Sequence, residues 1–249
     1  MNNSPKILGV IPARYNSTRL PGKVLREIAG KPMIYWVYHN ALRSPLLENL
    51  IIATDSDLVL SACNDLNLPV TMTGDHPTGS DRLHEVMLRT DADIYVNIQG
   101  DEPTVRPEHI EGLLTPLLSN DAFGVSTLKV KMTAEAAKSP DVVKVVTGSD
   151  GGALYFSRHP IPFQRNAENA TQYYKHLGLY AYRREALQSF FTFPQTPLEL
   201  SESLEQLRLI ENGIRIHVAE TKFDTVGVDT QQDLNEVIAM FSNQRSAIG

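Results

Sequence analysis

Three cationic side chains follow the first apolar run of the sequence. Arg14, Arg19 and Lys23 fall within ten positions, just after that run. If the run is a buried strand, they lie at its carboxyl end, where open α/β sheets bind ligands. Arginine offers forked donors, lysine a compact charge, and a turn at Pro21-Gly22 offers backbone N–H groups to phosphate oxygens. The cluster predicts a triphosphate site without a Walker or Rossmann glycine pattern; a solvated basic loop is the alternative.

Two separate carboxylates also follow apolar runs and could hold a metal ion. Asp101 comes after apolar residues 94–98, and Asp229 occurs in the segment Val226-Gly-Val-Asp-Thr. Magnesium is typically held by one or two carboxylates together with substrate phosphates. Each aspartate has a simpler interpretation, Asp101 as a turn residue and Asp229 as the N-cap of the last helix. Neither residue is decisive alone.

Other acidic residues and the histidines suggest competing chemistries. Asp55 and Asp57 have the D-x-D spacing of metal-dependent glycosyltransferases, although helix capping is the interpretation we favour. The seven histidines show no spacing typical of a transition-metal site, so zinc is not expected. His176 stands out because it opens a run with polar groups on one face. No G-x-S-x-G motif indicates a serine hydrolase.

The composition excludes several classes of protein. The 249 residues carry a formal charge of −6, with 42% hydrophobic and 21% charged residues, as in ordinary globular proteins. An acidic chain argues against a nucleic-acid partner. No run approaches the ~20 apolar residues of a membrane span, and no signal peptide is apparent, so we expect a cytoplasmic protein. With Cys63 as the single cysteine, no intrachain disulfide can form.

The elements that must position these residues alternate between short β-branched runs and helical periodicities, which predicts a mainly parallel sheet flanked by helices. In the first half, the expected strands are 7–11, 50–53, 70–72 and 94–98, and the expected helices 33–42, 58–66, 80–89 and 107–118. In the second half, the expected strands are 125–130, 142–146, 153–156, 177–182 and 214–218, and the expected helices 203–212 and 231–240. A hairpin turn is expected at 149–152, and Gly213 should cap the first of these two helices. The pattern fits one α/β domain, 1–249, with an inserted β-rich lobe at about 123–200.

With these motifs the chain resembles the 3-deoxy-manno-octulosonate cytidylyltransferases, or CMP-KDO synthetases, over nearly its whole length. The segments that carry the resemblance are IPARYNSTRLPGK (11–23), GKPMI (30–34), IIATDSD (51–57), NIQGDEP (97–103), VKVV (143–146), ALYFSR (153–158), KHLGLYAYR (175–183), LEQLR (204–208) and GVDT (227–230).

The resemblance implies a nucleotide-binding α/β fold of the nucleotide-diphospho-sugar transferase type with a β-rich dimerisation lobe. It implies an Mg²⁺-dependent transfer in which CTP and a keto-deoxy sugar acid (KDO) give CMP-KDO and pyrophosphate, for lipopolysaccharide biosynthesis. It also implies a homodimer.

The same resemblance assigns roles to particular residues. Those implied to bind the nucleotide are Pro12, Ala13, Arg14, Ser17, Arg19, Lys23, Thr78, Gly79, Ser80, Arg82 and Gly100. Those implied to bind the sugar acid are Gln99, Arg158, His176, Tyr180, Glu205 and Gln206. The metal ligands would be Asp101 and Asp229, and the catalytic groups Arg14, Lys23 and Asp101.

Three other functions remain open at this point. The acceptor could be another acidic sugar, such as an amino-substituted KDO or a sialic acid. Asp55 and Asp57 could serve a glycosyltransferase, which would release no pyrophosphate. A nucleotide-binding regulator without catalysis is the third, but such a protein needs no pair of metal carboxylates.

Overall fold

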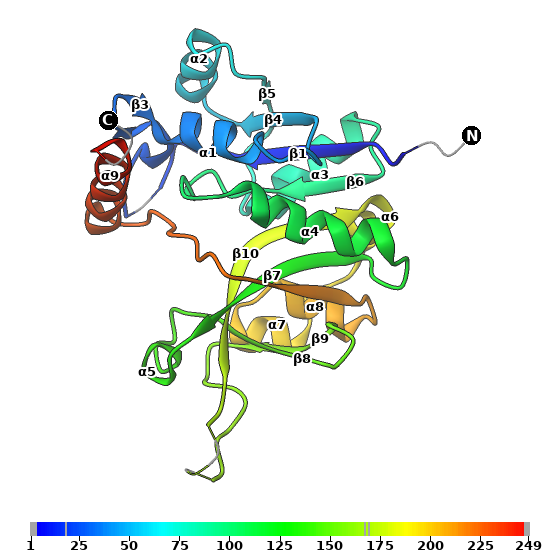
Figure 1. Ribbon diagram of the computed structural model, residues 1–249. Coiled ribbons are helices and arrows are strands. Elements are labelled where there is room, and N and C mark those ends of the chain that lie inside the picture. Colours follow the sequence, from blue (N-terminus) through cyan, green and yellow to red (C-terminus); the bar gives the residue numbers. More distant parts are fainter. Residues whose placement is uncertain (1–3, 18, 167, 169, 247–249) are drawn as a thin grey trace. The chain divides into compact units, whose positions relative to one another are not determined.

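The computed structural model describes residues 4–17, 19–166, 168 and 170–246, and the chain divides into two compact units (Figure 1). The first unit is discontinuous, since it consists of Met1–Ile110 and Thr225–Gly249. The second unit is Glu111–Asp224 and contains the segment expected to form the β-rich lobe. Helix α4 (Pro107–Ser119) begins in one unit and ends in the other.

The first unit is built on parallel strands in the order β6-β1-β4-β5. Their bounds are β1 (Ile7–Pro12), β4 (Asn49–Thr54), β5 (Val70–Met72) and β6 (Ile94–Asn97). All four residues of β6, three apolar or aromatic residues followed by Asn97, are buried, as expected for a strand covered on both faces. The predicted parallel sheet and its four strands are confirmed, and the carboxyl ends of β1 and β6 come to the same edge.

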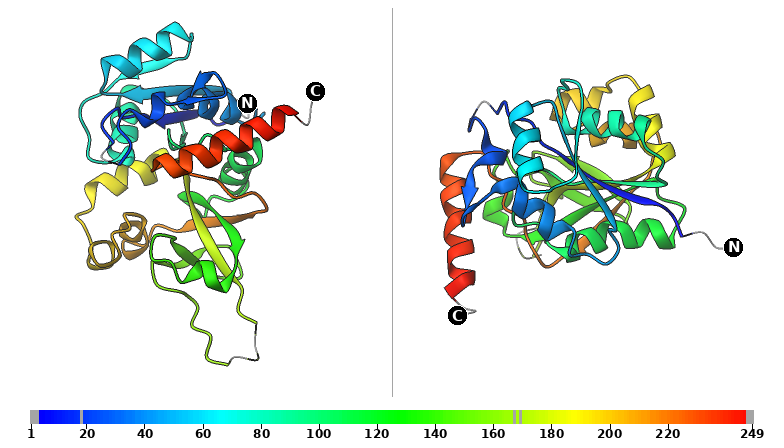
Figure 2. Two further views of the ribbon diagram at one scale, coloured as in Figure 1. Left: turned by 90° about the vertical axis from the view of Figure 1, so that its left-hand side faces the viewer. Right: turned by 90° about the horizontal axis from the view of Figure 1, so that it is seen from above.

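The first unit also contains helices. They are α1 (Met33–Ala41), α2 (Asp57–Asp65), α3 (Gly79–Arg89) and α9 (Gln231–Ser246), with a 3₁₀ turn, η1 (Lys23–Leu25), and a small hairpin of β2 (Glu27–Ile28) and β3 (Lys31–Pro32). Helices α1, α2 and α3 connect successive strands as the sequence predicts, and α9 follows β11 (Ile216–Thr221). Helix α9 lies beside the hairpin (Figure 2). Its Leu234 and Val237 share a buried cluster with Ile28, Met33 and Val228. This cluster packs α9 against the β2–β3 hairpin and the start of α1.

The second unit is built around a long antiparallel pair, β7 (Val125–Met132) and β10 (Tyr173–Arg183). Strand β11 (Ile216–Thr221) adds to β7 in parallel, and β8 (Lys144–Thr147) forms a hairpin with β9 (Ala153–Ser157). The hairpin turn predicted at 149–152 is confirmed, with Gly151 at a φ of 80°. The helices are α5 (Ala134–Ala137), α6 (Arg184–Thr192), α7 (Pro197–Glu202) and α8 (Gln206–Glu211).

The predicted helix at 203–212 is wrong over its first turn. Ser203 adopts a left-handed conformation with φ 52° and ends α7, where its N–H donates to the carbonyl of Glu199. A second helix, α8, then begins at Gln206. Gly213, at φ 77°, follows the end of α8 as predicted.

Within the described residues, no helix is long and apolar enough to cross a membrane.

Candidate active site

The basic loop after β1 closes on itself at the edge of the parallel sheet. The N–H of Gly22 donates to the carbonyl of Tyr15 at 2.9 Å, and the N–H of Ala13 donates to the carbonyl of Ala53 at 2.8 Å. Gly22 has a φ of 67°, which favours glycine at this turn. Arg14 and Arg19 are exposed on this loop, whereas Lys23 is buried. Thr18, part of the same motif, lies outside the described residues.

A cavity of about 310 Å³ opens beside this loop, within the first unit. It is lined by residues of three segments, the loop after β1, the start of α3 and the end of β6. The lining residues are Pro12, Arg14, Lys23, Val24, His76, Pro77, Thr78, Gly79, Arg82, Gln99, Gly100 and Asp101. Most residues expected to bind the nucleotide are therefore brought together, and Gln99, which was expected to bind the sugar acid, lines the same cavity. Ala13, Ser17, Arg19 and Ser80 are not part of this lining.

Asp101 and Asp229 converge on one cation. The ammonium of Lys23 donates to the carboxylate of Asp101 and, at 2.9 Å, to Oδ1 of Asp229. The guanidinium of Arg19 contacts Oδ2 of Asp229 at 2.8 Å. Burial favours a lower pKa for Lys23, but the charges and hydrogen bonds of Asp101 and Asp229 outweigh it and raise the pKa. Lys23 is therefore a fixed cation between two carboxylates from distant parts of the sequence.

The segment before α9 places Asp229, and its carboxylate is not used as a helix cap. The N–H of Val228 donates to the carbonyl of Asp101 at 2.9 Å, which joins the two aspartate segments directly. The helix start is capped instead by Thr230 and Asp233, because the carboxylate of Asp233 accepts from the N–H groups of Asp229 and Thr230 at 3.0 and 2.7 Å. The carboxylate of Asp229 remains available to cations.

This pair of carboxylates fits a hard divalent ion. Asp101 and Asp229 both reach the Lys23 ammonium, so their oxygens lie within roughly 6 Å of one another, given hydrogen bonds of ordinary length. Among the described residues, no group of three or more His, Cys, Asp or Glu side chains could hold a metal. Mg²⁺ suits such a site, because it commonly takes one or two carboxylates and completes its shell with phosphate oxygens and water.

Gly100 allows the ends of β1 and β6 to approach closely. A Cβ at Gly100 would lie 2.7 Å from the backbone carbonyl oxygen of Pro12, closer than side chains tolerate. Only glycine fits here without a backbone shift, and the shift would move Asp101, the next residue.

The start of α3 is a rigid wall of the cavity. Thr78 and Asp81 form a capping box. Arg82 is only 2% exposed, and it donates to Oδ2 of Asp55 at 2.8 Å and to the carbonyl of Gly74 at 3.3 Å. Asp55 is thus engaged by Arg82, whereas Asp57 lies in the first turn of α2, whose N-cap is Ser56. The helix-capping role expected for this D-x-D pair is therefore wrong.

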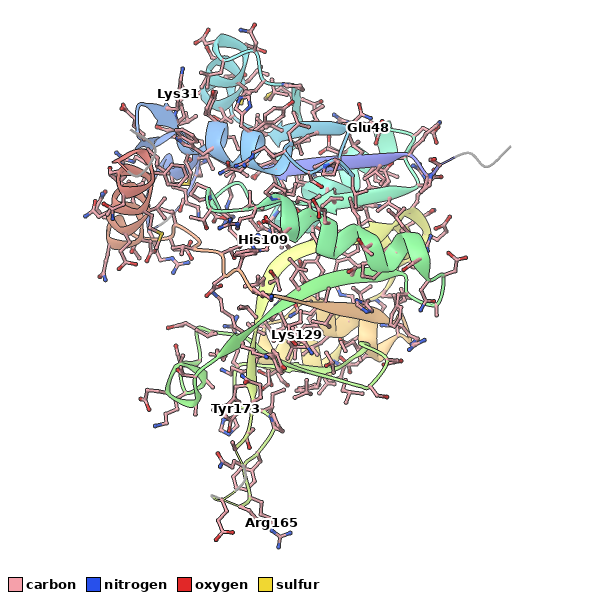
Figure 3. The ribbon with its side chains drawn as sticks, in the orientation of Figure 1. Lys31, Glu48, His109, Lys129, Arg165 and Tyr173 are labelled. Atoms are coloured by element: carbon pink, nitrogen blue, oxygen red, sulfur yellow. The ribbon has the colours of Figure 1, made fainter. Side chains whose placement is uncertain are left out.

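The second unit gathers other predicted residues on one face of the β7–β10 pair. His176 Nε2 lies 3.0 Å from the hydroxyl of Thr127, and the ring centroids of His176 and Tyr180 are 5.4 Å apart. Burial lowers the pKa of His176 to about 3 and raises that of Tyr180 well above its usual value. Lys129, labelled in Figure 3, belongs to the same strand as Thr127, and its ammonium lies 4.3 Å from the ring centroid of Tyr174.

Arg158 is held by main-chain carbonyls. Its guanidinium donates to the carbonyls of Glu202 at 2.8 Å, Pro140 at 3.2 Å and Ser203 at 3.4 Å. No carboxylate forms an ion pair with it among the contacts of the described residues, so its charge is available to an anion. Glu205 precedes α8, and Gln206, in its first turn, is buried.

Two supporting residues had no assigned role in the sequence analysis. Lys144 is fully buried and donates to the carbonyls of Ser139, Val142 and Arg158, and burial lowers its pKa. The carboxylate of Glu202 accepts from the N–H of Arg158 at 2.8 Å. The role of Lys144 could have been suspected from the sequence, because it is a lysine inside the apolar run VKVV. No feature of the sequence around Glu202 indicated its contact with Arg158.

The chain is similar to proteins of known family. A family model described as Cytidylyltransferase matches residues 8–216, most of the chain, so the protein is a cytidylyltransferase by family. The match ends before Asp229. A relative from Acidobacterium capsulatum, named 3-deoxy-manno-octulosonate cytidylyltransferase, is 52% identical and aligns over 94% of this chain and 96% of the relative. The chain belongs to the 3-deoxy-manno-octulosonate cytidylyltransferase family, which confirms the resemblance seen in the sequence.

Solved structures agree with this assignment. The structure of a CMP:2-keto-3-deoxy-manno-octonic acid synthetase complexed with CTP matches with a TM-score of 0.93 at 47% identity, covering 96% of this chain and 99% of that one. A 4-diphosphocytidyl-2C-methyl-D-erythritol synthase from Anaerococcus prevotii matches with a TM-score of 0.63 at 15% identity and shares the fold.

Proposed function

We propose that this protein transfers the cytidylyl group of CTP to KDO, a keto-deoxy sugar acid, and releases pyrophosphate. The observation that carries the proposal is the convergence of Asp101 and Asp229 on Lys23 beside the cavity that Arg14 also lines. The names of the similar proteins, one of them complexed with CTP, support the choice of nucleotide and acceptor.

In this mechanism the anomeric hydroxyl of the sugar acid attacks the α-phosphorus of CTP, and pyrophosphate leaves in line. Such transfers depend on positioning and charge stabilisation, so no covalent nucleophile is needed. Arg14 and Lys23 would bind phosphate oxygens and stabilise the charge that develops on them. Gln99, at the same cavity, would contact the acceptor, and Arg158 would bind its carboxylate through a charge-assisted pair.

We infer that Mg²⁺ is the cofactor and that Asp101 and Asp229 would hold it. When bound, the ion would neutralise phosphate charge and lower the pKa of the attacking hydroxyl. Lys23 would then exchange the two carboxylates for phosphate oxygens.

We also infer a homodimer formed through the second unit. Phe163, the most exposed large apolar side chain of the described residues at 85%, lies in this unit, together with Leu154 at 62% and Leu200 at 61%. Such residues are typical of protein interfaces when they lie in one patch. Size-exclusion chromatography with light scattering tests this, and a monomer at micromolar concentration would contradict it. We further propose that the reaction occurs in the cytoplasm and supplies lipopolysaccharide synthesis.

The experiment that tests the activity is a pyrophosphate-release assay with each nucleoside triphosphate and a panel of sugar acids. We expect release with CTP and KDO and much less with sialic acid or an amino-substituted KDO. Asp101→Asn should abolish turnover and leave the melting temperature nearly unchanged. Near-normal Mg²⁺-dependent turnover by Asp101→Asn would contradict the metal assignment, and preference for another acidic sugar would overturn the choice of acceptor.

A further inference from the structure

Strand β10 is irregular where it passes Thr127. The register of the β7–β10 pair shifts between Leu177 and Tyr180, which face the adjacent residues Leu128 and Thr127. The register thus passes over residues 178–179 between these two pairs. Bulges of this kind often re-aim side chains beside functional sites, and here His176 and Tyr180 lie on either side of the irregularity.

The hydroxyl of Thr127 holds both ends of this bulge. Its oxygen lies 2.8 Å from the carbonyl of Leu179 and 3.1 Å from the carbonyl of Leu177. It also lies 3.0 Å from Nε2 of His176. A hydroxyl has one proton to donate and can accept through its lone pairs.

The direction of the bond to His176 follows from this count. Both carbonyls are acceptors only, so the single proton of Thr127 must point to one of them. If it pointed to His176 instead, the hydroxyl lone pairs would face the carbonyl oxygen of Leu179 at 2.8 Å with no proton between them. Thr127 therefore accepts from His176, and Nε2 of the imidazole carries a proton.

The opposite ring nitrogen is then an acceptor. The rings of Phe156 and His176 pack in a T-shaped arrangement with centroids 4.9 Å apart, and burial and the neighbouring charge of Lys175 lower the pKa of His176 to about 3. The ring is consequently neutral near pH 7 and has one N–H. Its Nδ1 makes no hydrogen bond to the described part of the chain, and the residue as a whole is partly exposed.

We propose that Thr127 fixes His176 as the Nε2–H tautomer, so that Nδ1 accepts a hydrogen bond from a hydroxyl group of the sugar acid. The ligand in this statement rests on the proposed function, whereas the tautomer does not. An acceptor nitrogen repels a carboxylate, so His176 recognises a neutral hydroxyl and the carboxylate is left to a cation such as Arg158. Thr127 is a positioning residue that acts through His176.

The tautomer is tested on the ligand-free protein by long-range ¹H–¹⁵N NMR correlation of ¹⁵N-histidine-labelled samples. The His176 signals are assigned by their loss in His176→Asn. We expect the Nε2–H pattern, unchanged from pH 5 to pH 8, in the wild type and in Thr127→Ser, and a different tautomer mixture in Thr127→Val. A wild-type Nδ1–H pattern, or titration of the ring in this range, would overturn the proposal.

The ligand part is tested by steady-state kinetics on the full chain. Losing one well-oriented neutral hydrogen bond costs about 1 kcal/mol, so Thr127→Val should raise the KM for KDO roughly five- to tenfold, with the KM for CTP changed less than twofold. Thr127→Ser should restore the wild-type value. Ser126→Ala is the matched control, because the adjacent Ser126 faces the other side of the strand and its buried hydroxyl has no hydrogen-bond partner in the described chain.

The two proposals fail in different ways. A protein that uses no sugar acid refutes the proposed function, while the NMR pattern still decides the tautomer. If KDO is turned over and Thr127→Val leaves its KM unchanged, or raises both KM values equally, the role of Thr127 and His176 in binding the hydroxyl is refuted. Monodeoxy analogues of KDO add a direct check, because one of them should bind more weakly to the wild type and show no further loss in Thr127→Val.

Discussion

Replacing Lys23 with methionine should slow turnover and yet tighten the binding of a divalent ion to the nucleotide-free protein. Lys23 is only 7% exposed, and its ammonium contacts both Asp101 and Asp229. In the ligand-free protein, this ammonium neutralises the two carboxylates that we propose as metal ligands. Methionine keeps an unbranched stem of similar length and removes the charge that bridges the two carboxylates. An incoming ion then competes only with Arg19, which contacts the other oxygen of Asp229.

The size of the effect follows from the electrostatics of the site. Two unit charges about 4 Å apart interact by about 1 kcal/mol in water and about 4 kcal/mol at an effective dielectric constant of 20. The Asp229 side chain is 45% exposed, so the net gain should lie near the lower end, about 1–2 kcal/mol. This corresponds to roughly 5- to 30-fold tighter binding. Turnover should fall about 10²- to 10³-fold, as when a donor to a developing charge is removed.

The measurement is a titration with Mn²⁺ without nucleotide, in which electron paramagnetic resonance reports the free ion. Lys6→Met is the matched control, because it makes the same change in net charge at an exposed pair with Asp91. If Lys23→Met binds Mn²⁺ no more tightly than the wild type and Lys6→Met, then Lys23 and the ion do not share these carboxylates.

Three further outcomes are expected. Arg158→Ala should raise the KM for KDO roughly 10- to 100-fold with little change in the KM for CTP. Arg158→Lys should recover little of the KDO binding, because one ammonium cannot reproduce the three carbonyl contacts of the guanidinium. Equal losses for both substrates would contradict this role. Gly100→Ala should lower the free energy of unfolding by about 1–3 kcal/mol and reduce kcat/KM for CTP, because the added Cβ would meet the Pro12 carbonyl oxygen at 2.7 Å. A melting temperature and an activity equal to those of the wild type would refute the steric argument. Glu199→Gln should cost about 3 kcal/mol in urea denaturation near pH 7, because it breaks a largely buried pair with Arg208. Burial would raise the pKa of Glu199, but hydrogen bonds from Arg208 outweigh it, and the net pKa is lowered from 4.5. The wild-type advantage is therefore present above that pH and should shrink as the pH falls below it. A gap that stays constant below pH 4.5 would show that the charge is not its source.

Continuous apolar runs made most of the fold predictable. Strands β1, β4 and β6 were expected within one or two residues because a strand buried on both faces needs an unbroken apolar segment. The break between α7 and α8 could not be foreseen, because Ser203 is a non-glycine residue in a left-handed conformation, which local preference disfavours. The bulge in β10 was equally hidden, since a register shift depends on the pairing of two strands rather than on either sequence alone.

The site residues also fall into two groups, those that could be proposed from the sequence and those that depend on contacts between distant segments. Arg14, Lys23 and Asp101 could be proposed from their positions after apolar runs, because parallel strands end at a common edge. That Asp229 joins them could not be derived from spacing, since it depends on hydrogen bonding between the segments at Asp101 and Val228. The role of Thr127 was also out of reach, because its neighbours become visible only when β7 and β10 are paired.

The discontinuity of the first unit has a consequence for how the protein is made. A ribosome synthesises Asp101 long before Asp229, and all of the second unit is translated between them. The nascent amino-terminal segment therefore has half of the carboxylate pair, and it lacks the α9 side chains that complete the cluster around Ile28 and Met33. Formation of the proposed metal site is therefore deferred until the segment that carries Asp229 and α9 has left the exit tunnel and docked.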